Sequence, residues 1–350
     1  MSEPIVRFKE VDIVFGNDPE SALPLIDQEK TREEIQAATG QILGSARASL
    51  DVYEGQIVVL MGLSGSGKST LLRAVNGLNK VTRGEVLVND GSGYINPTNC
   101  PATTLRQLRL NRVAMVFQQF GLLPWRTVAD NVGLGLELAG MSAAKRRERV
   151  QEQLDLVNLS EWGNKQVHEL SGGMQQRVGL ARAFATQAPI LLMDEPFSAL
   201  DPLIRDRLQD ELLDLQKKTG RTIIFVSHDL DEAVKIGSKI AIMEGGRVIQ
   251  FGTAQDIVLN PATEYVADFV AHMNPLNVLR ACDIMAPLEG TPDPDLPAVP
   301  GEKTVREVMD IRLSTGKTVL VEENGSPTGQ IGDEEIYRSL LKKQTNGATT

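Results

Sequence analysis

The chain has 350 residues, with 46 acidic against 36 basic side chains and a formal net charge of −10. This acidic balance argues against nucleic acid or an anionic membrane surface as a partner. No apolar stretch approaches the roughly 20 residues needed to cross a bilayer, and the first residues lack the pattern of a secretory signal. The sequence predicts a cytoplasmic protein with room for more than one domain, in which Cys100 and Cys282 are free thiols.

The first strands are expected within residues 5–15 and 47–61, and between them lies an insert at about residues 25–43. Its polar, alanine-containing stretch predicts one short helix. Asp27 is expected to cap the start of that helix, and Gly40 its end.

A phosphate-binding loop follows the buried strand predicted at residues 57–61. Residues 62–70, GLSGSGKST, match G-x-x-x-x-G-K-[ST] in full and precede a helix predicted at residues 69–76. Glycines let successive backbone amides point at phosphate oxygens, Lys68 supplies charge to the β- and γ-phosphates, and the Ser69 hydroxyl is placed to ligate Mg²⁺. The alternative, an ordinary glycine-rich loop with a solvated lysine, does not explain this context.

A second buried strand, residues 190–194, ends in two adjacent carboxylates. Neighbouring residues of an extended strand point to opposite sides, so Asp194 and Glu195 can take different roles. We expect Asp194 to contact Mg²⁺, directly or through water, and Glu195 to be the general base for an attacking water. Solvated acids at a strand end are the alternative. A third strand, residues 222–227, places His228 where a neutral imidazole can donate to a γ-phosphate.

Residues 170–177, LSGGMQQR, form a glycine turn that leads into a helix. With the phosphate loop and the acidic strand end, this turn makes the chain resemble the ATP-binding subunits of ATP-binding-cassette (ABC) transporters over about residues 5–270. The other motifs of the family stand in order: the Q-loop glutamine Gln118, the D-loop at residues 198–201 and the switch histidine His228.

The resemblance implies an α/β fold of the P-loop NTPase class. Its expected parts are a RecA-like parallel sheet, an N-terminal antiparallel β subdomain and a helical signature lobe at about residues 122–185. It also implies a homodimer with ATP between the phosphate loop of one copy and the signature turn of the other, so that hydrolysis of ATP separates the two copies.

The residue roles carried over from the family are expectations of the same kind. The implied catalytic residues are Lys68, Gln118, Glu195 and His228, and the implied Mg²⁺ ligands are Ser69, Gln118 and Asp194. The implied nucleotide contacts are Phe15, Gly62, Leu63, Ser64, Gly65, Ser66, Gly67, Lys68, Ser69, Thr70, Ser171, Gly172, Gly173 and Gln175, with Asp201 in the D-loop.

For two aromatic residues, a binding role and packing in the core are both possible interpretations. Phe15 is the candidate to stack on the adenine, with Tyr53 as a weaker candidate, and the alternative is that Phe15 packs in the core of the first sheet. Trp125, in the apolar segment at residues 121–128, is expected to line the groove that receives a helix of the permease with Leu122 or Leu123. Core packing is the alternative for that segment.

Finer resemblance concerns the cargo. The insert and residues 61–65 and 197–205 are similar to importers of quaternary amines, and residues 118–126 and 271–279 are most similar to the choline branch. The implied function is an ATPase that drives import of choline, or of glycine or proline betaine, through a separate integral-membrane permease. A periplasmic or extracellular binding protein would supply the cargo, and the subunit would lie at the cytoplasmic face of the bacterial inner membrane. The alternative class is a soluble ABC-type clamp ATPase, which the single cassette and the missing coiled-coil insertion disfavour.

We expect an ABC ATPase domain at residues 1–273, a proline-rich linker at 274–302 and a small α+β extension at 303–350. The extension is predicted to hold a short helix, strands at about 317–322 and 327–331, and a helix at 333–341. It resembles part of one cystathionine-β-synthase repeat. Related importers carry two full repeats, so regulation through this tail is not implied, and packing against the cassette or its twin is the expected role.

Overall fold

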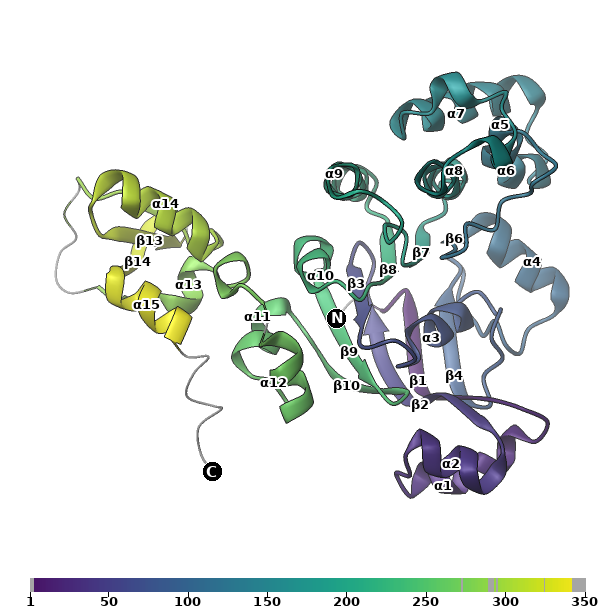
Figure 1. The fold of residues 1–350 in the computed structure, drawn as a ribbon, viewed down its shortest axis with the longest axis horizontal. Helices are drawn as coiled ribbons and strands as arrows, with labels where there is room; N and C mark the ends of the chain where they lie inside the picture. Colours follow the sequence, from purple (N-terminus) through teal and green to yellow (C-terminus); the bar gives the residue numbers. More distant parts are fainter. Residues whose placement is uncertain (1–2, 272, 289–292, 294, 324, 342–350) are drawn as a thin grey trace. The chain divides into compact units, whose positions relative to one another are not determined.

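The computed structural model describes residues 3–271, 273–288, 293, 295–323 and 325–341. It separates into two compact units, Met1–Phe251 and Gly252–Thr350 (Figure 1). None of the helices in the described part of the chain combines the length and the apolar character needed to span a membrane.

The centre of the first unit is a six-stranded sheet. Its strands, in sheet order, are β10 (Arg247–Gly252), β9 (Lys239–Glu244), β3 (Ile57–Met61), β8 (Thr222–Val226), β7 (Ile190–Asp194) and β6 (Val113–Val116). The strands from β9 to β6 pair in parallel, and every residue of β3, β7 and β8 is buried. Parallel strands buried on both faces need continuous apolar runs, which is why these three strands were predictable from sequence.

A second, antiparallel sheet has the order β2-β1-β4-β5. Its strands are β1 (Val6–Phe15), β2 (Ile42–Val52), β4 (Arg83–Asn89) and β5 (Tyr94–Ile95). One hydrophobic cluster joins both sheets, with Phe8 and Val86 from the antiparallel sheet packed in the same core as Leu60 and Leu192. This core fixes the antiparallel subdomain against the strand that precedes the phosphate loop.

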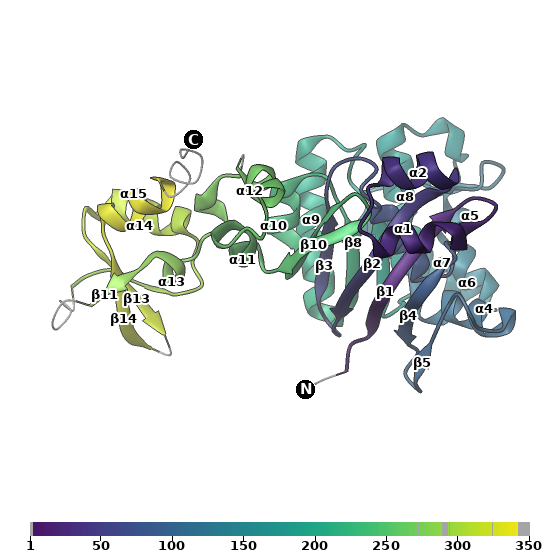
Figure 2. The same ribbon diagram turned by 90° about the horizontal axis from the view of Figure 1, so that it is seen from below.

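The insert between β1 and β2 contains the 3-10 segment Pro19–Ala22 and two helices, α1 (Leu23–Asp27) and α2 (Arg32–Thr39), which lie beside β2 in Figure 2. The prediction of a single helix capped by Asp27 was wrong, because Asp27 ends α1. The cap of α2 is Thr31, whose side chain accepts from the Glu34 amide while Glu34 bonds back to the Thr31 amide. Gly40 ends α2 with φ 70°, as predicted.

The remaining helices of the first unit flank the large sheet or form the helical lobe. They are α3 (Lys68–Ala74), α4 (Ala102–Asn111), α5 (Val128–Val132), α6 (Leu134–Leu138), α7 (Ala143–Leu156), α8 (Gly172–Ala185), α9 (Pro202–Thr219) and α10 (Leu230–Ile236), with 3-10 segments at Ser160–Trp162 and Val167–Glu169. Helices α5 to α7 lie together with α8 at one end of this unit (Figure 1). The lobe therefore carries the signature turn at the start of α8.

The second unit is built around a sheet of order β11-β14-β13-β12. Its elements are α11 (Ala254–Leu259), α12 (Glu264–Val270), the 3-10 segment Pro275–Asn277, α13 (Ala281–Ile284), β11 (Ala286–Pro287), β12 (Ala298–Pro300), α14 (Val305–Thr315), β13 (Val319–Glu323), β14 (Ser326–Ile331) and α15 (Asp333–Leu341). Strands β13 and β14 and helix α15 lie where the extension was expected to have them.

The boundaries of this unit differ from the expected ones. The chain divides after Phe251 rather than near residue 273, and the stretch at 274–302 holds α13, β11 and β12. Leu279, Ala281 and Val299 are buried in the hydrophobic core of this unit, so the chain there contributes to a packed structure. Its proline content suggested a linker, but short edge strands accept proline as well.

Cys100 and Cys282 are free thiols, as predicted.

Candidate ATP site

The phosphate loop turns sharply between β3 and α3. Gly62 has φ 142° and Gly67 has φ 99°, backbone conformations that residues with a side chain rarely adopt. A Cβ atom on Gly62 would lie 2.1 Å from the Met243 carbonyl oxygen, and one on Gly67 would lie 2.3 Å from the Gly44 carbonyl oxygen. The loop therefore passes so close to β9 and β2 that only glycine fits at both positions.

The Lys68 side chain is curled into this loop. Its Nζ donates to the carbonyls of Gly62 and Leu63, at 2.8 and 2.9 Å, and lies 3.5 Å from the Ser66 hydroxyl. Burial lowers the pKa of Lys68, while the negative charges of Glu195 and Asp194 oppose that shift. Hydrogen bonds to neutral oxygens offset only part of the free-energy cost of burying this ammonium group. An anion bound in the loop would stabilise it further.

Asp194 lies at the end of β7 with its side chain fully buried. Its Oδ1 accepts from the Ser69 hydroxyl at 2.6 Å, and its Oδ2 accepts from Arg73 Nη2 at 2.8 Å. A hydroxyl and a carboxylate side by side are oxygen donors of the type that Mg²⁺ prefers, completed by water and substrate phosphates, so these residues fit the ion. Arg73 was missed by sequence reasoning, although its position four residues after Ser69 puts both on one helix face.

Three candidate catalytic side chains meet at one oxygen of Glu195. Gln118 Nε2 donates to Glu195 Oε2 at 3.1 Å, and His228 Nδ1 lies 3.5 Å from the same atom. The expectation that Asp194 and Glu195 diverge because both are in an extended strand was wrong, since Glu195 has φ 47° and lies past the strand end. The left-handed backbone turns its carboxylate toward β6 and β8 instead.

The signature turn, residues 170–175, begins helix α8. The Ser171 hydroxyl accepts from the Met174 amide at 3.4 Å and caps the helix, with Gly172 and Gly173 in its first turn. The turn shares a hollow of about 280 Å³ with the D-loop, lined by Ser171, Gly173, Met174, Arg177, Ala199, Leu200, Asp201 and Ile204. Among the described residues, no hydrogen bond joins this turn to the phosphate loop of the same chain.

Gln175 and Asp201 are engaged within the chain. Gln175 Nε2 donates to the carbonyls of Val167 and Leu170, at 3.2 and 3.1 Å, so its side chain holds the signature turn rather than facing outward. Asp201 Oδ1 accepts from the Ile204 amide at 3.0 Å and caps α9. Both residues thus shape the hollow by fixing its two walls.

Helix α8 carries two further residues that sequence reasoning missed. Gln176 is buried, donates to the Glu195 carbonyl at 3.3 Å and accepts from the Ala199 amide at 3.2 Å. Arg182 donates to the carbonyls of Phe120 and Gly121, both at 2.7 Å, two and three residues after the Q-loop glutamine. These contacts tie the signature helix to the loops that carry Glu195 and Gln118. Only the position of these residues on the signature helix could have pointed to them.

The two aromatic candidates lie at the surface. Phe15 is 40% exposed, which excludes core packing, and a Cβ atom on Gly44 would lie 2.8 Å from both the Phe15 ring and the Thr70 methyl group. The ring is therefore close to the end of the phosphate loop. Tyr53 follows the opposite end of β2, near Arg7. Trp125 is 73% exposed, which excludes core packing for it too, while Leu122 and Leu123 are half-buried.

Comparison with known proteins shows the family of this chain. The family model described as ABC transporter matches residues 46–198. The glycine betaine/proline betaine transport system ATP-binding protein ProV of Escherichia coli (strain K12) is 48% identical over 97% of this chain and 83% of its own length. The trimethylamine N-oxide transport system ATP-binding protein TmoW of Ruegeria pomeroyi is 40% identical over 98% of both chains.

Among solved structures, the dimeric ATP-binding cassette MJ0796 with ADP and phosphate is 32% identical and superimposes with a TM-score of 0.61, covering 71% of this chain and 98% of its own. The likeness confirms the cassette fold that the motifs predicted. Because the likeness to ProV and TmoW extends over nearly the whole of this chain, the protein belongs to the ATP-binding subunits of ABC transporters and is an ATPase.

Proposed function

We propose that this ATPase drives the import of a small methylated amine through a separate permease. The support is the likeness to ProV and TmoW, whose names give glycine betaine, proline betaine and trimethylamine N-oxide as cargo. Each of these compounds carries a fully substituted, methylated nitrogen. Choline, the cargo that the sequence analysis favours, is not in the names of these two relatives, so glycine betaine is the cargo to test first.

The hydrolytic step that the site supports uses the side chains already described. The loop amides and Lys68 would bind the phosphates, and Ser69 and Asp194 would hold Mg²⁺, which would offset the charge on the phosphate oxygens. Glu195 accepts a proton from water as the water oxygen bonds to the γ-phosphorus and the bond to the β–γ bridging oxygen breaks. The observation that supports this assignment is that Gln118 and His228 both lie close to one oxygen of Glu195, where they would orient its carboxylate.

A homodimer completes the site in this proposal. Ser171 and Gly173 line a hollow beside the D-loop, and the signature turn makes no hydrogen bond to the phosphate loop within the described part of the chain. The solved relative MJ0796 is dimeric with its nucleotide bound. Packing two chains head to tail would bring the signature turn of one to the γ-phosphate held by the other, with Phe15 on the adenine.

The permease contact is proposed at Trp125, whose exposed ring follows the loop that carries Gln118. Large exposed aromatic side chains of this kind are typical of protein interfaces. In this arrangement the subunit lies at the cytoplasmic face of the membrane, and a binding protein on the other side delivers the cargo. A soluble clamp ATPase would leave Trp125 without a role.

The test is ATP hydrolysis by the assembled transporter in vesicles, with a permease and a binding protein from the same organism. Binding protein loaded with glycine betaine should raise ATP turnover above the level with empty binding protein, and choline, proline betaine and trimethylamine N-oxide are compared in the same assay. Lys68→Ala should abolish the response, because the phosphates lose their cationic partner. If no methylated amine changes turnover while ATP is still hydrolysed, the proposed cargo class is wrong.

A further inference from the structure

The insert between β1 and β2 reaches the phosphate loop through one side chain. Arg32 is the first residue of α2, and its Nη1 donates to the carbonyl of Gly65, in the middle of the loop. Its Nη2 donates to the Gly44 carbonyl of β2 at 3.3 Å. One guanidinium therefore bridges the insert, the phosphate loop and the strand that lies against Gly67.

The chemistry of this guanidinium is unusual for a surface arginine. Burial lowers the pKa of Arg32, yet within the described residues it forms no ion pair and its Nε has no hydrogen-bond partner. Ordering and burying an arginine without a carboxylate costs free energy that two carbonyl contacts only partly return. A gain in stability therefore does not explain why Arg32 lies here. Its contact with the phosphate loop does.

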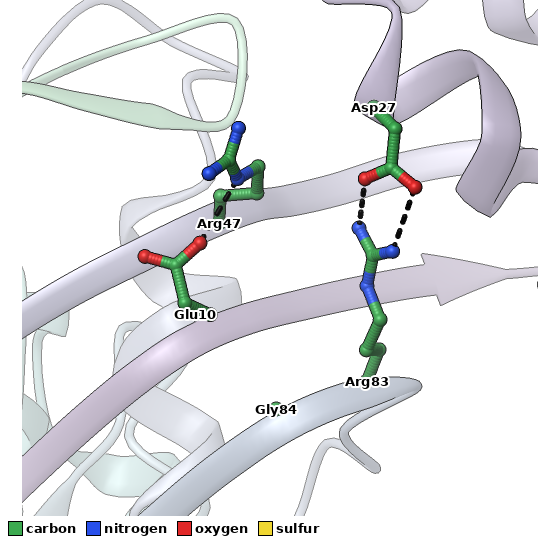
Figure 3. A pocket seen from close by; sticks show the side chains of 5 residues that line it. All are labelled: Glu10, Asp27, Arg47, Arg83 and Gly84. Atoms are coloured by element: carbon green, nitrogen blue, oxygen red, sulfur yellow. Dashed lines mark hydrogen bonds and ion pairs between the residues drawn. The ribbon is translucent and has the colours of Figure 1, made fainter.

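The insert that presents Arg32 is itself firmly held. Arg83 donates to both oxygens of Asp27, at 2.9 and 2.7 Å, and to the buried Asp12 of β1 at 2.6 Å. The Asp27–Arg83 pair (Figure 3) lines a hollow of about 450 Å³ together with Glu10, Arg47 and Gly84. Because bidentate pairs fix geometry in two directions, the end of α1 cannot shift independently of the β subdomain.

A small core supports the same conclusion. Ile26 of α1 and Ile35 of α2 are fully buried and share a hydrophobic cluster with Leu43 of β2. The two helices thus form a rigid extension of the antiparallel sheet, fastened by a core and by the Arg83 network. Arg32 projects from this extension to Gly65, so a change in the position of the loop is resisted by the insert.

We propose that Arg32 is a positioning residue for the ATP site, and that nucleotide binding and the order of the insert are energetically coupled through it. The contact with the Gly65 carbonyl fixes a peptide unit in the middle of the phosphate loop, and the positive charge of Arg32 lowers the energy of anions nearby. The proposal rests on residues 62–70 being the ATP site. Coupling is reciprocal, so bound nucleotide must in turn stabilise the contact that α2 makes.

The experiment compares the full-length chain with Arg32→Ala, Arg32→Lys and the matched control Arg7→Ala. Arg7 sits near the start of β1, where it pairs with Asp51, far along the strand from Phe15. ADP affinity is measured by calorimetry, and amide hydrogen exchange of residues 31–40 is measured with and without ADP. ADP avoids turnover during the measurement.

We expect ADP to slow exchange in residues 31–40 of the unaltered chain. Arg32→Ala should abolish that protection and weaken ADP binding on the order of tenfold, which corresponds to about 1.4 kcal/mol. Arg32→Lys should restore part of both effects because it keeps the charge and one contact, and Arg7→Ala should behave like the unaltered chain. A purely structural Arg32 would leave the ADP-induced protection in place.

Three results separate the failure of this inference from failure of the proposed site. If ADP does not protect residues 31–40 in the unaltered chain, or if Arg32→Ala binds ADP normally, the inference is wrong whatever the stability of the variants. If Lys68→Ala binds ADP normally, residues 62–70 are not the nucleotide site and the proposed function itself fails at that point.

Discussion

The division of labour between Asp194 and Glu195 is decided by one backbone conformation. Asp194 stays in the buried strand, where Ser69 and Arg73 hold both of its oxygens. Glu195 enters the left-handed region, so its carboxylate meets Gln118 and His228 instead. The sequence predicted that the two side chains diverge, but through the wrong geometry, because a strand end cannot be located to one residue from an apolar run.

Glu195→Gln tests the assignment of the general base. The amide keeps the size and one acceptor oxygen of the carboxylate but cannot take a proton from water. We expect ATP binding to be retained and hydrolysis to fall by about 100-fold or more, the usual contribution of a positioned base. Steady-state phosphate release and nucleotide titration measure the two effects. Glu54→Gln, at an exposed position after β2, is the control, and normal hydrolysis by Glu195→Gln would show that another group is the base.

A second carboxyl near the site is predicted to make stability depend on pH. Glu232 is buried in α10, where Ser227 Oγ donates to its Oε2 and Gln209 Nε2 donates to its Oε1 at 3.0 Å. Burial raises the pKa of Glu232 above the ordinary value of 4.5, although these hydrogen bonds oppose the shift. The folded state therefore binds this proton more tightly than the unfolded chain does. The resulting contribution to the free energy of unfolding is lost as pH rises through the raised pKa.

Glu232→Gln removes this titration while keeping polar contacts to Ser227 and Gln209. The free energy of unfolding of the unaltered chain, taken relative to the variant, should therefore decrease from pH 5 to pH 8. Urea unfolding at both pH values measures that difference, and Glu161→Gln, at an exposed site, should leave it constant. An equal difference at both pH values would show that Glu232 does not titrate in this range.

At the level of elements, the strands that position the site were predictable and the contacts between loops were not. Strands β3, β7 and β8 are continuous apolar runs. Their parallel pairing places the phosphate loop, Glu195 and His228 together at the carboxyl ends of the strands. The start of α2 was missed because the capping box of Thr31 and Glu34 is a stronger signal than a lone Asp27. Arg182 and Gln176 were not predicted because their partners are backbone carbonyls and amides, which no side-chain pattern reveals.

Arg182 connects the signature helix to the Q-loop, and its removal should affect both. Arg182→Ala deletes two hydrogen bonds to the carbonyls of Phe120 and Gly121, and we expect a loss of about 1 kcal/mol in the free energy of unfolding. Because Gln118 is then less well fixed, kcat should fall several-fold with little change in KM for ATP. Arg147→Ala, on the exposed face of α7, is the control, and an unchanged kcat in Arg182→Ala would remove the proposed link.

At the scale of the whole molecule, composition was a weaker guide than the motifs. Strands β13 and β14 lie where they were predicted, but the preceding proline-rich stretch contributes β11, β12 and buried residues such as Val299. Short strands paired at a sheet edge leave little periodicity to detect. The division after Phe251 could not be predicted because β10 continues the large sheet up to that point without a change in composition.

The dimer that the proposed mechanism requires makes a prediction for two molecules at once. In the Glu195→Gln background, ATP should convert the chain from monomer to a stable dimer in size-exclusion chromatography with light scattering, because the nucleotide is held between two copies and is not hydrolysed. Adding Ser171→Arg should prevent this conversion, since the long cationic side chain would fill the hollow beside Gly173 and Asp201. Ser142→Arg, exposed at the start of α7, adds the same side chain elsewhere and should still dimerise. Dimerisation of the Ser171→Arg variant to the same extent would mean that the signature turn does not face the nucleotide of the partner.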